Sequence, residues 1–310
     1  MPTGMSPVQI RPAGPSYPPD RVCSPRDGGG TQIQETCNIL GPMFRVPQVM
    51  AAGIVLVFIS NMVYSTLART MSKPEIEKEF LSLLLRKSGL RIAPNSQELF
   101  VFKSGRKSPN FINTGALTDG ESLAKVKWAF GNFIANLLSE GKLQDFDFIF
   151  GPAYKGIALA ALACEGLREL CGINKRYLYD RKEEKAYADR KMDQIIVGSG
   201  YFKPGDKILI IDDVITTGDT KLEAIEKLRI LGEHKVVGLV LAVDREERMG
   251  DAEHVEQKSA VQNIEEQFGI RVFSILGMQR IYDLVKNEIS DDIRRAWINY
   301  YDRYGVVSLR

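Results

Sequence analysis

Short apolar runs alternate with helix-like segments through the middle of the chain, and this order restricts the fold more than any other feature. The expected elements, in chain order, are the strand 146–150, the helix 157–170, the strands 177–179 and 207–211, the helix 221–231 and the strand 236–243. This order predicts a mostly parallel sheet covered by helices on both faces. Ligands of such sheets bind at the carboxyl ends of the strands, so the turns that follow the strands are the candidate site.

Two further helices are expected before the sheet. The first begins after Ser72, which can cap it, and ends before Gly89. The second runs from Glu121 to Ser139, with an apolar stripe that includes Phe130 and Phe133. Residues 71–310 are therefore expected to form one folded α/β domain.

The composition changes abruptly near residue 70. Residues 1–70 hold five arginines, no lysine and nine of the fourteen prolines, and the stretch 12–30 shows no helix or strand period, so we expect disorder there. The run 46–68 carries no charge and is long enough to span a bilayer. Polar residues dilute it, however, so that its apolar centre is only about ten residues, as in a signal peptide.

Three interpretations of residues 1–70 stay open. Translation begins at Met71, or the segment is a targeting sequence or membrane anchor, or it forms an extra apolar helix on the body. A membrane is a partner only if residues 46–68 are an anchor. Sequencing the N-terminus of the native protein separates these cases, because an N-terminus upstream of Met43 excludes a start at Met71.

Charge and cysteine content exclude several classes of protein. A net charge of +2 is too small to indicate nucleic acid as the main partner, so any basic chemistry must be local. The four cysteines and two histidines show neither the spacing of a zinc site nor that of a disulfide framework. We therefore expect a cytoplasmic protein with free thiols and no metal site built from its own side chains.

The strongest chemical signal is the segment 208–220. A buried strand ends in Asp212 and Asp213, and a turn of hydroxyls and glycine leads into a helix. The backbone N–H groups of such a turn converge, and the helix N-terminus adds a positive field, which together make an anion site. Gly218 lets the backbone approach the ligand. The two acids suit ribose hydroxyls or a metal-bound water.

This segment resembles the motif with which type I phosphoribosyltransferases bind PRPP (phosphoribosyl pyrophosphate). The resemblance implies that the two acids hold the ribose 2′- and 3′-hydroxyls and that the turn wraps the 5′-phosphate. It also implies the fold of that family, a mostly parallel sheet flanked by helices with a small N-terminal hood. The PRPP-binding residues implied here are Asp212, Asp213, Val214, Ile215, Thr216, Thr217, Gly218, Asp219 and Thr220.

Three more segments resemble the orotate phosphoribosyltransferases in particular. The stretch 102–113 implies that Lys103 approaches the reacting ribose and pyrophosphate, and that Phe111 and Ile112 line the orotate pocket together with Thr216. That family often has two aromatic residues where this chain has Phe111 and Ile112. The loop 151–156 implies that Tyr154 and Lys155 contact pyrophosphate.

The third of these segments, 244–248, implies that Arg245 binds orotate through a bidentate pair, which is the geometry that guanidinium and carboxylate groups share.

A basic stretch, 179–191, resembles the mobile loop that closes over pyrophosphate in that family and reaches into the partner subunit of a dimer. The residues that the resemblance brings to PRPP here are Arg181, Lys182, Lys185, Tyr187 and Asp189. The family usually has a histidine where this chain has Tyr187, and glycines follow it that this chain lacks. Asp189 keeps an acid where the family has glutamate. A loop poor in glycine is expected to be stiffer.

The resemblance implies an enzyme that transfers the phosphoribosyl group of PRPP to orotate. The implied catalytic residues are Lys103, Lys155, Lys182, Lys185 and Asp189. Mg²⁺ is expected as the cofactor, bound mainly through PRPP, and a homodimer is expected in which the loop 182–191 is shared. Two alternatives remain, a phosphoribosyltransferase for another base and a PRPP-binding regulator. Residues 103–113 and Arg245 argue against the first, and the basic loop argues against the second.

Overall fold

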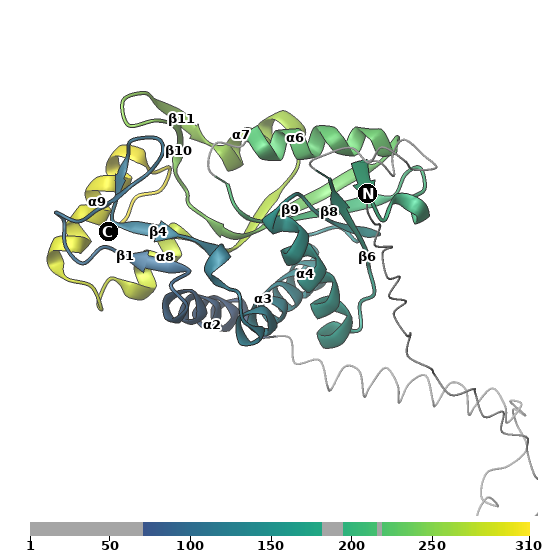
Figure 1. The fold of residues 1–310 in the computed structure, drawn as a ribbon, viewed down its shortest axis with the longest axis horizontal. Helices are drawn as coiled ribbons and strands as arrows, with labels where there is room; N and C mark the ends of the chain where they lie inside the picture. The colour runs from purple at the N-terminus through teal and green to yellow at the C-terminus, as the bar shows by residue number, and fades with distance from the viewer. Residues whose placement is uncertain (1–70, 182–194, 216–218) are drawn as a thin grey trace, which may run out of the picture. The chain divides into compact units, whose positions relative to one another are not determined.

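The computed structural model describes residues 71–181, 195–215 and 219–310, without the side chains of residues 219–222. The expectations for residues 1–70 and for the loop 182–191 lie outside the described residues and stay predictions. A sheet with the strand order β12-β9-β8-β5-β6-β7 forms the centre of the described part (Figure 1). Its strands are β5 (Phe148–Gly151), β6 (Arg176–Asp180), β7 (Ile196–Val197), β8 (Lys207–Val214), β9 (Lys235–Asp244) and β12 (Val272–Gly277).

Neighbouring strands of this sheet run parallel except for β7, which pairs antiparallel with β6. The prediction of a mostly parallel sheet is therefore confirmed. The α-helices of the described residues are α2 (Lys73–Arg86), α3 (Gly120–Ser139), α4 (Lys155–Cys171), α6 (Asp219–Leu228), α7 (Ala260–Phe268), α8 (Met278–Val285) and α9 (Asp291–Tyr304).

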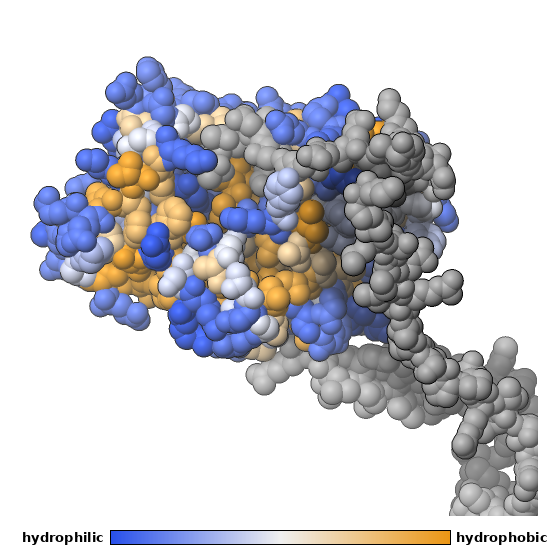
Figure 2. Space-filling model, in the orientation of Figure 1, coloured by the Kyte–Doolittle hydropathy of each residue, from blue (hydrophilic) through white to orange (hydrophobic). Residues whose placement is uncertain are grey.

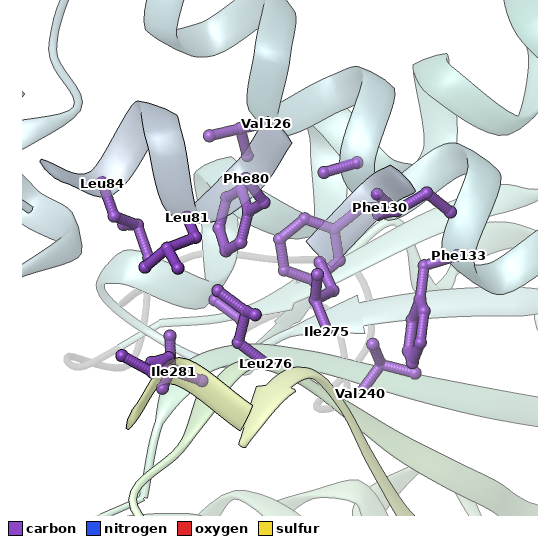
Figure 3. Packing of buried hydrophobic residues seen from close by; sticks show 14 of the residues in the cluster. Phe80, Leu81, Leu84, Val126, Phe130, Phe133, Val240, Ile275, Leu276 and Ile281 are labelled. Atoms are coloured by element: carbon purple, nitrogen blue, oxygen red, sulfur yellow. The ribbon is translucent and has the colours of Figure 1, made fainter. Parts of the chain in front are cut away.

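Helices cover both faces of the sheet because the buried strands are apolar on both sides. In β8, Leu209 and Ile211 pack into the core formed with α2, α3 and α4, whereas Ile208 and Ile210 pack into a second core with α6 and α7. Figure 3 shows part of the first core, where Phe130 and Phe133 of α3 lie against the sheet. Figure 1 shows α3 and α4 on one side of the sheet and α6 and α7 on the other.

A hood of short strand pairs and helices lies at one end of the sheet in Figure 1. Its pairs are β1–β4, β2–β3 and β10–β11. The bounds are β1 (Leu90–Ile92), β2 (Phe100–Val101), β3 (Lys107–Ser108), β4 (Asn110–Ile112), β10 (Arg248–Gly250) and β11 (Val255–Ser259). Helix α9 packs here through the buried Trp297 and Tyr301. None of the described helices has the length and apolar character needed to cross a membrane.

The structure changes two predicted boundaries. Strand β8 continues through Val214, three residues beyond the expected strand 207–211, so that Asp212 and Asp213 lie within its carboxyl end. The cause is the neighbouring strand, because Asp212 pairs with Leu241 and Val214 pairs with Val243. The helix expected at 221–231 begins earlier and ends at Leu228, and a 3₁₀ turn over Arg229–Leu231 follows it.

Candidate active site

The loop between β5 and α4 is tight because two glycines, one at each of its ends, pack against each other. A Cβ atom on Gly151 would lie 2.2 Å from the carbonyl oxygen of Gly156, and one on Gly156 would lie 2.7 Å from a ring carbon of Pro152. Only glycine permits this approach. The loop contains a cis peptide bond between Ala153 and Tyr154 and delivers Lys155 as the first residue of α4.

The tight loop brings Lys155 against an acid of the predicted PRPP motif. The Nζ atom of Lys155 lies 2.9 Å from Oδ2 of Asp213, and the Thr114 hydroxyl donates to the same oxygen at 2.9 Å. Asp213 is only 6% exposed, whereas half of the Lys155 side chain is accessible. Two residues predicted from separate motifs therefore form one ion pair, whose ammonium group stays accessible to an anion.

The neighbouring acid, Asp212, contacts the backbone at the end of β8. Its Oδ1 accepts a hydrogen bond of 2.8 Å from the backbone N–H of Asp213. Among residues 71–181, 195–215 and 219–310, no three His, Cys, Asp or Glu side chains lie together as a metal site. The pair of acids supplies carboxylate oxygens at this edge, which is the kind of ligand that Mg²⁺ takes together with substrate phosphates.

A pocket of about 680 Å³ opens beside this ion pair. On the face drawn in Figure 2, apolar residues (orange) gather mostly in the middle, and hydrophilic residues (blue) lie around them. Site residues predicted from the sequence that line the pocket are Lys103, Phe111, Ile112, Lys155, Val214, Ile215 and Arg245. They come from the hood, from the β5–α4 loop and from the ends of β8 and β9, so the fold unites motifs that are far apart in sequence.

Arg245 lies in this pocket between an aromatic ring and a carboxylate. Its guanidinium carbon lies 4.3 Å from the ring centre of Phe102. Its Nε and Nη2 atoms donate to the Glu247 carboxylate at distances of 2.7 to 3.1 Å. Burial is the largest single influence and lowers the pKa of Arg245, but the charge of Glu247, the two tyrosines Tyr300 and Tyr301 and the hydrogen bonds to Glu247 together outweigh it, so that the pKa lies above its ordinary value. A charged guanidinium therefore lines the pocket.

This pairing limits how Arg245 can bind a ligand. The edge formed by Nε and Nη2 is taken by Glu247, whereas Nη1 donates to no residue in the described part of the chain. A carboxylate binds a guanidinium group through one of its edges, and the group offers more than one edge. A ligand carboxylate would therefore meet the edge that includes Nη1.

Two tyrosines of α9 form hydrogen bonds with Glu247 and with the backbone of Arg245. The Tyr300 hydroxyl donates to Oε2 of Glu247 at 3.1 Å, and the Tyr301 hydroxyl donates to the carbonyl oxygen of Arg245 at 2.7 Å. Burial, and secondly the charge of Glu247, raise the pKa of both tyrosines above the ordinary value. Both hydroxyls therefore keep their protons and remain donors.

Arg106 completes the wall of the pocket. It is buried and donates to the carbonyl oxygens of Arg248, Met249 and Asp251, with its guanidinium 4.6 Å from the ring centre of Tyr304. These bonds tie the β2–β3 hairpin, which carries Lys103, to the β10 strand that follows Arg245.

The remaining predicted site residues divide into two groups. Tyr154 is 74% exposed at the start of α4, and the backbone N–H of Arg181 donates to the carbonyl oxygen of Ile195 at 2.8 Å. Asp219 and Thr220 begin α6, although their side chains are not described. The residues that lie outside the described part are Lys182, Lys185, Tyr187, Asp189, Thr216, Thr217 and Gly218.

Sequence reasoning missed several residues that shape the site. Arg106 and Glu247 lie inside segments that were singled out, and their charge was a usable signal. Phe102 also lies in such a segment, next to Lys103. Thr114 carried no signal, because it reaches Asp213 across 99 positions of sequence. Asp180 directly precedes the basic loop, yet no role was assigned to it.

Comparisons with known proteins find relatives of this chain by sequence and by fold. A model of the phosphoribosyl transferase domain matches residues 122–272. The orotate phosphoribosyltransferase of Bifidobacterium adolescentis is 35% identical over 239 residues, which cover 74% of this chain and 98% of the relative. Orotate phosphoribosyltransferase 2 of Saccharomyces cerevisiae is 36% identical over 242 residues, which cover 77% of this chain and 99% of the relative. The solved orotate phosphoribosyltransferase of Francisella tularensis is 30% identical, with a TM-score of 0.59 over 73% of this chain and 98% of its own.

Proposed function

This chain belongs to the orotate phosphoribosyltransferases, and we propose that the residues at the carboxyl ends of β5, β8 and β9 carry out the reaction of that family. The reaction transfers the phosphoribosyl group of PRPP to orotate and yields orotidine 5′-phosphate and pyrophosphate in de novo UMP synthesis. The observation that carries this assignment of residues is the Lys155–Asp213 ion pair beside the pocket that Arg245 lines.

The reaction needs positioning and electrostatics more than covalent chemistry by the protein. The bond between orotate N1 and ribose C1 forms, the bond between C1 and the pyrophosphate oxygen breaks, and its electron pair leaves with pyrophosphate. Negative charge therefore builds on the leaving group, and groups that meet this charge lower the barrier. The cations that neutralise it are Lys103, Lys155, Arg181, Lys182 and Lys185.

The proposed ribose site and the proposed base site are built from different segments. Asp212 and Asp213 accept hydrogen bonds from the ribose hydroxyls, and the turn 216–220 wraps the 5′-phosphate at the start of α6. The orotate ring lies against Phe111 and Ile112, and its carboxylate meets Arg245. The proposed place of the base is supported by the pocket that Phe111, Ile112 and Arg245 line together.

Mg²⁺ is the proposed cofactor, and when bound it would supply positive charge that offsets the charge of the pyrophosphate. PRPP supplies most of its ligands, since Mg²⁺ is usually held by substrate phosphates and one or two carboxylates. Asp212 and Asp213 are the acids that fit this role, because both lie at the same end of β8.

The acceptor base is tested by an assay of the full chain with PRPP and Mg²⁺. We expect orotate to be consumed, and uracil, adenine and hypoxanthine to react at least about 100-fold more slowly, because a site built for a charged group leaves its polar partners unpaired with other ligands. Loss of orotate is followed by absorbance, and omission of Mg²⁺ serves as a control. Turnover of a purine without turnover of orotate would contradict the proposal.

Replacing Lys185 with alanine tests the basic loop. We expect kcat to fall at least about 10-fold, because one charge that meets the leaving pyrophosphate is lost. Steady-state rates with orotate measure the effect. The matched control is Lys258→Ala on the surface, where Lys258 pairs with the exposed Glu266. An unchanged kcat in Lys185→Ala would remove the loop from the mechanism.

The same variant tests the proposed homodimer with a shared loop. A mixture of Lys185→Ala and Asp213→Ala subunits contains hybrid dimers in which one site has both native residues. We expect this mixture to regain activity that neither variant has alone. No regain after subunit exchange would show that each chain uses its own loop.

The cytoplasm is the proposed location. In its support, Cys164 and Cys171 are free thiols in the described part of the chain, and burial raises the pKa of both above the ordinary value of a thiol. Unpaired cysteines are typical of reducing compartments.

A further inference from the structure

A buried carboxylate lies at the start of the basic loop. A carboxylate is not expected in a site that binds anions. Asp180 is the last residue of β6, is 3% exposed and directly precedes Arg181. A negative charge so close to groups that bind pyrophosphate opposes that binding through Coulomb repulsion. Charges of this kind remain buried only when they are paired and hydrogen-bonded.

Both oxygens of Asp180 contact segments of the active site. Oδ1 accepts a hydrogen bond of 2.5 Å from the backbone N–H of Ala153, in the loop that delivers Lys155. Oδ2 lies 2.7 Å from Nζ of Lys227, on the helix that follows the phosphate turn. One carboxylate thus links the β5–α4 loop to α6, and it stands where the stem of the basic loop leaves the sheet.

No shared core holds these two segments together. Helix α4 packs into the core on one face of the sheet and α6 into the core on the other. Asp180, at the carboxyl end of β6, contacts both the β5–α4 loop and α6. Its two contacts therefore link the position of Lys155 to the position of the helix that follows the phosphate turn. Lys227 is 31% exposed in its side chain, and it compensates the charge of Asp180.

We infer that Asp180 is a positioning residue for PRPP: its carboxylate sets the β5–α4 loop against α6, and Lys227 cancels the repulsion that this carboxylate would otherwise exert on pyrophosphate. The inference rests on the proposed function for the identity of the ligand. It assigns to Asp180 and Lys227 a role in binding PRPP and none in binding the base.

Three variants separate the two contacts of Asp180. Asp180→Ala removes both and is expected to weaken PRPP binding about 10-fold, because the loop that carries Lys155 is no longer held in position. Asp180→Asn keeps an oxygen for the Ala153 N–H and removes the charge, so its effect is expected to stay below about threefold. Lys227→Met leaves the charge of Asp180 uncompensated and is expected to weaken PRPP binding about 10-fold.

The double variant Asp180→Asn/Lys227→Met provides the decisive comparison. Because the uncompensated charge is gone, PRPP binding is expected to recover to the level of Asp180→Asn. A merely structural role for Asp180 does not predict this recovery together with an unchanged KM for orotate. The control is Asp145→Ala, which removes the 2.6 Å ion pair with Lys175 at the amino end of β5 and is expected to change neither constant.

PRPP binding is measured by calorimetry with Mg²⁺ and without any base, and both KM values are measured in the orotate assay. The inference is overturned if Asp180→Ala binds PRPP as tightly as the unaltered chain, if KM for orotate rises in parallel, or if the double variant does not recover. Should Asp180→Ala fail to fold, Lys227→Met and the double variant decide. Failure of the unaltered chain to consume orotate would overturn the proposed acceptor alone, since the calorimetric comparison needs no acceptor.

Discussion

Replacing Asp213 with alanine is expected to lower kcat/KM for PRPP by about 10²- to 10³-fold. Asp213 holds Lys155 at 2.9 Å and accepts the Thr114 hydroxyl, and it is proposed to bind the ribose. A hydrogen bond to a charged group contributes about 1.5–3 kcal/mol, and two losses in the lower part of that range come to about 3–4 kcal/mol. Each 1.4 kcal/mol, roughly, is a factor of ten in rate.

Two further variants show whether this loss belongs to the site. Asp213→Asn keeps an acceptor for Thr114 but no charge for Lys155, so its kcat/KM should lie between those of the unaltered chain and Asp213→Ala. Glu226→Ala removes an exposed acid of α6 that pairs with Arg229, and we expect no effect on activity. A loss below threefold in Asp213→Ala would exclude Asp213 from PRPP binding.

Replacing Arg245 with methionine is expected to raise KM for orotate about 100-fold and to change KM for PRPP less than threefold. The guanidinium is the largely buried cation that is proposed to meet the orotate carboxylate, and removing one partner of a charge pair in a desolvated pocket costs roughly 2–5 kcal/mol. Methionine preserves the contact with Phe102. Glu247 keeps Tyr300 and Arg106 as partners, so the fold should persist.

The comparison with Arg245→Lys separates charge from geometry. Lysine restores a cation without the planar fork, so KM for orotate should improve on that of the methionine variant yet stay about 10-fold above that of the unaltered chain. Thermal unfolding of both variants serves as the check on folding. If orotate binds the methionine variant as tightly as the unaltered chain, Arg245 is not the residue that recognises the base.

The sequence was sufficient to predict the sheet and most of the pocket, because both depend on local pattern. Apolar runs followed by Gly-Pro, Asp-Asp and Asp-Arg turns mark strand ends, and parallel strands bring those ends to one edge. Lys155 and Arg245, which follow β5 and β9, line one pocket, and Lys103 joins them from the β2–β3 hairpin. Their roles toward PRPP and orotate stay predictions.

The pairing of side chains could not be predicted, because it depends on distances between segments far apart in sequence. Lys155 and Asp213 are 58 positions apart, and only the close packing of Gly151 on Gly156 brings them within 2.9 Å. The length of β8 depended on its neighbour β9, since local pattern alone ended the strand before Asp212. Likewise, Glu247 occupies one edge of Arg245 because α9 supports it from the far end of the chain.

The support that α9 gives to the base pocket has a consequence for synthesis on the ribosome. The strands that carry the proposed ribose and phosphate contacts, β5 through β9, end at Asp244, whereas the tyrosines behind Arg245 and Glu247 are translated only at residues 300 and 301. Because chains emerge from their N-terminus, a nascent chain can fold the strands that carry the proposed PRPP contacts before the tyrosines that support the proposed orotate pocket have been made. The proposed recognition of the base by Arg245 is therefore completed last, when the final helix docks.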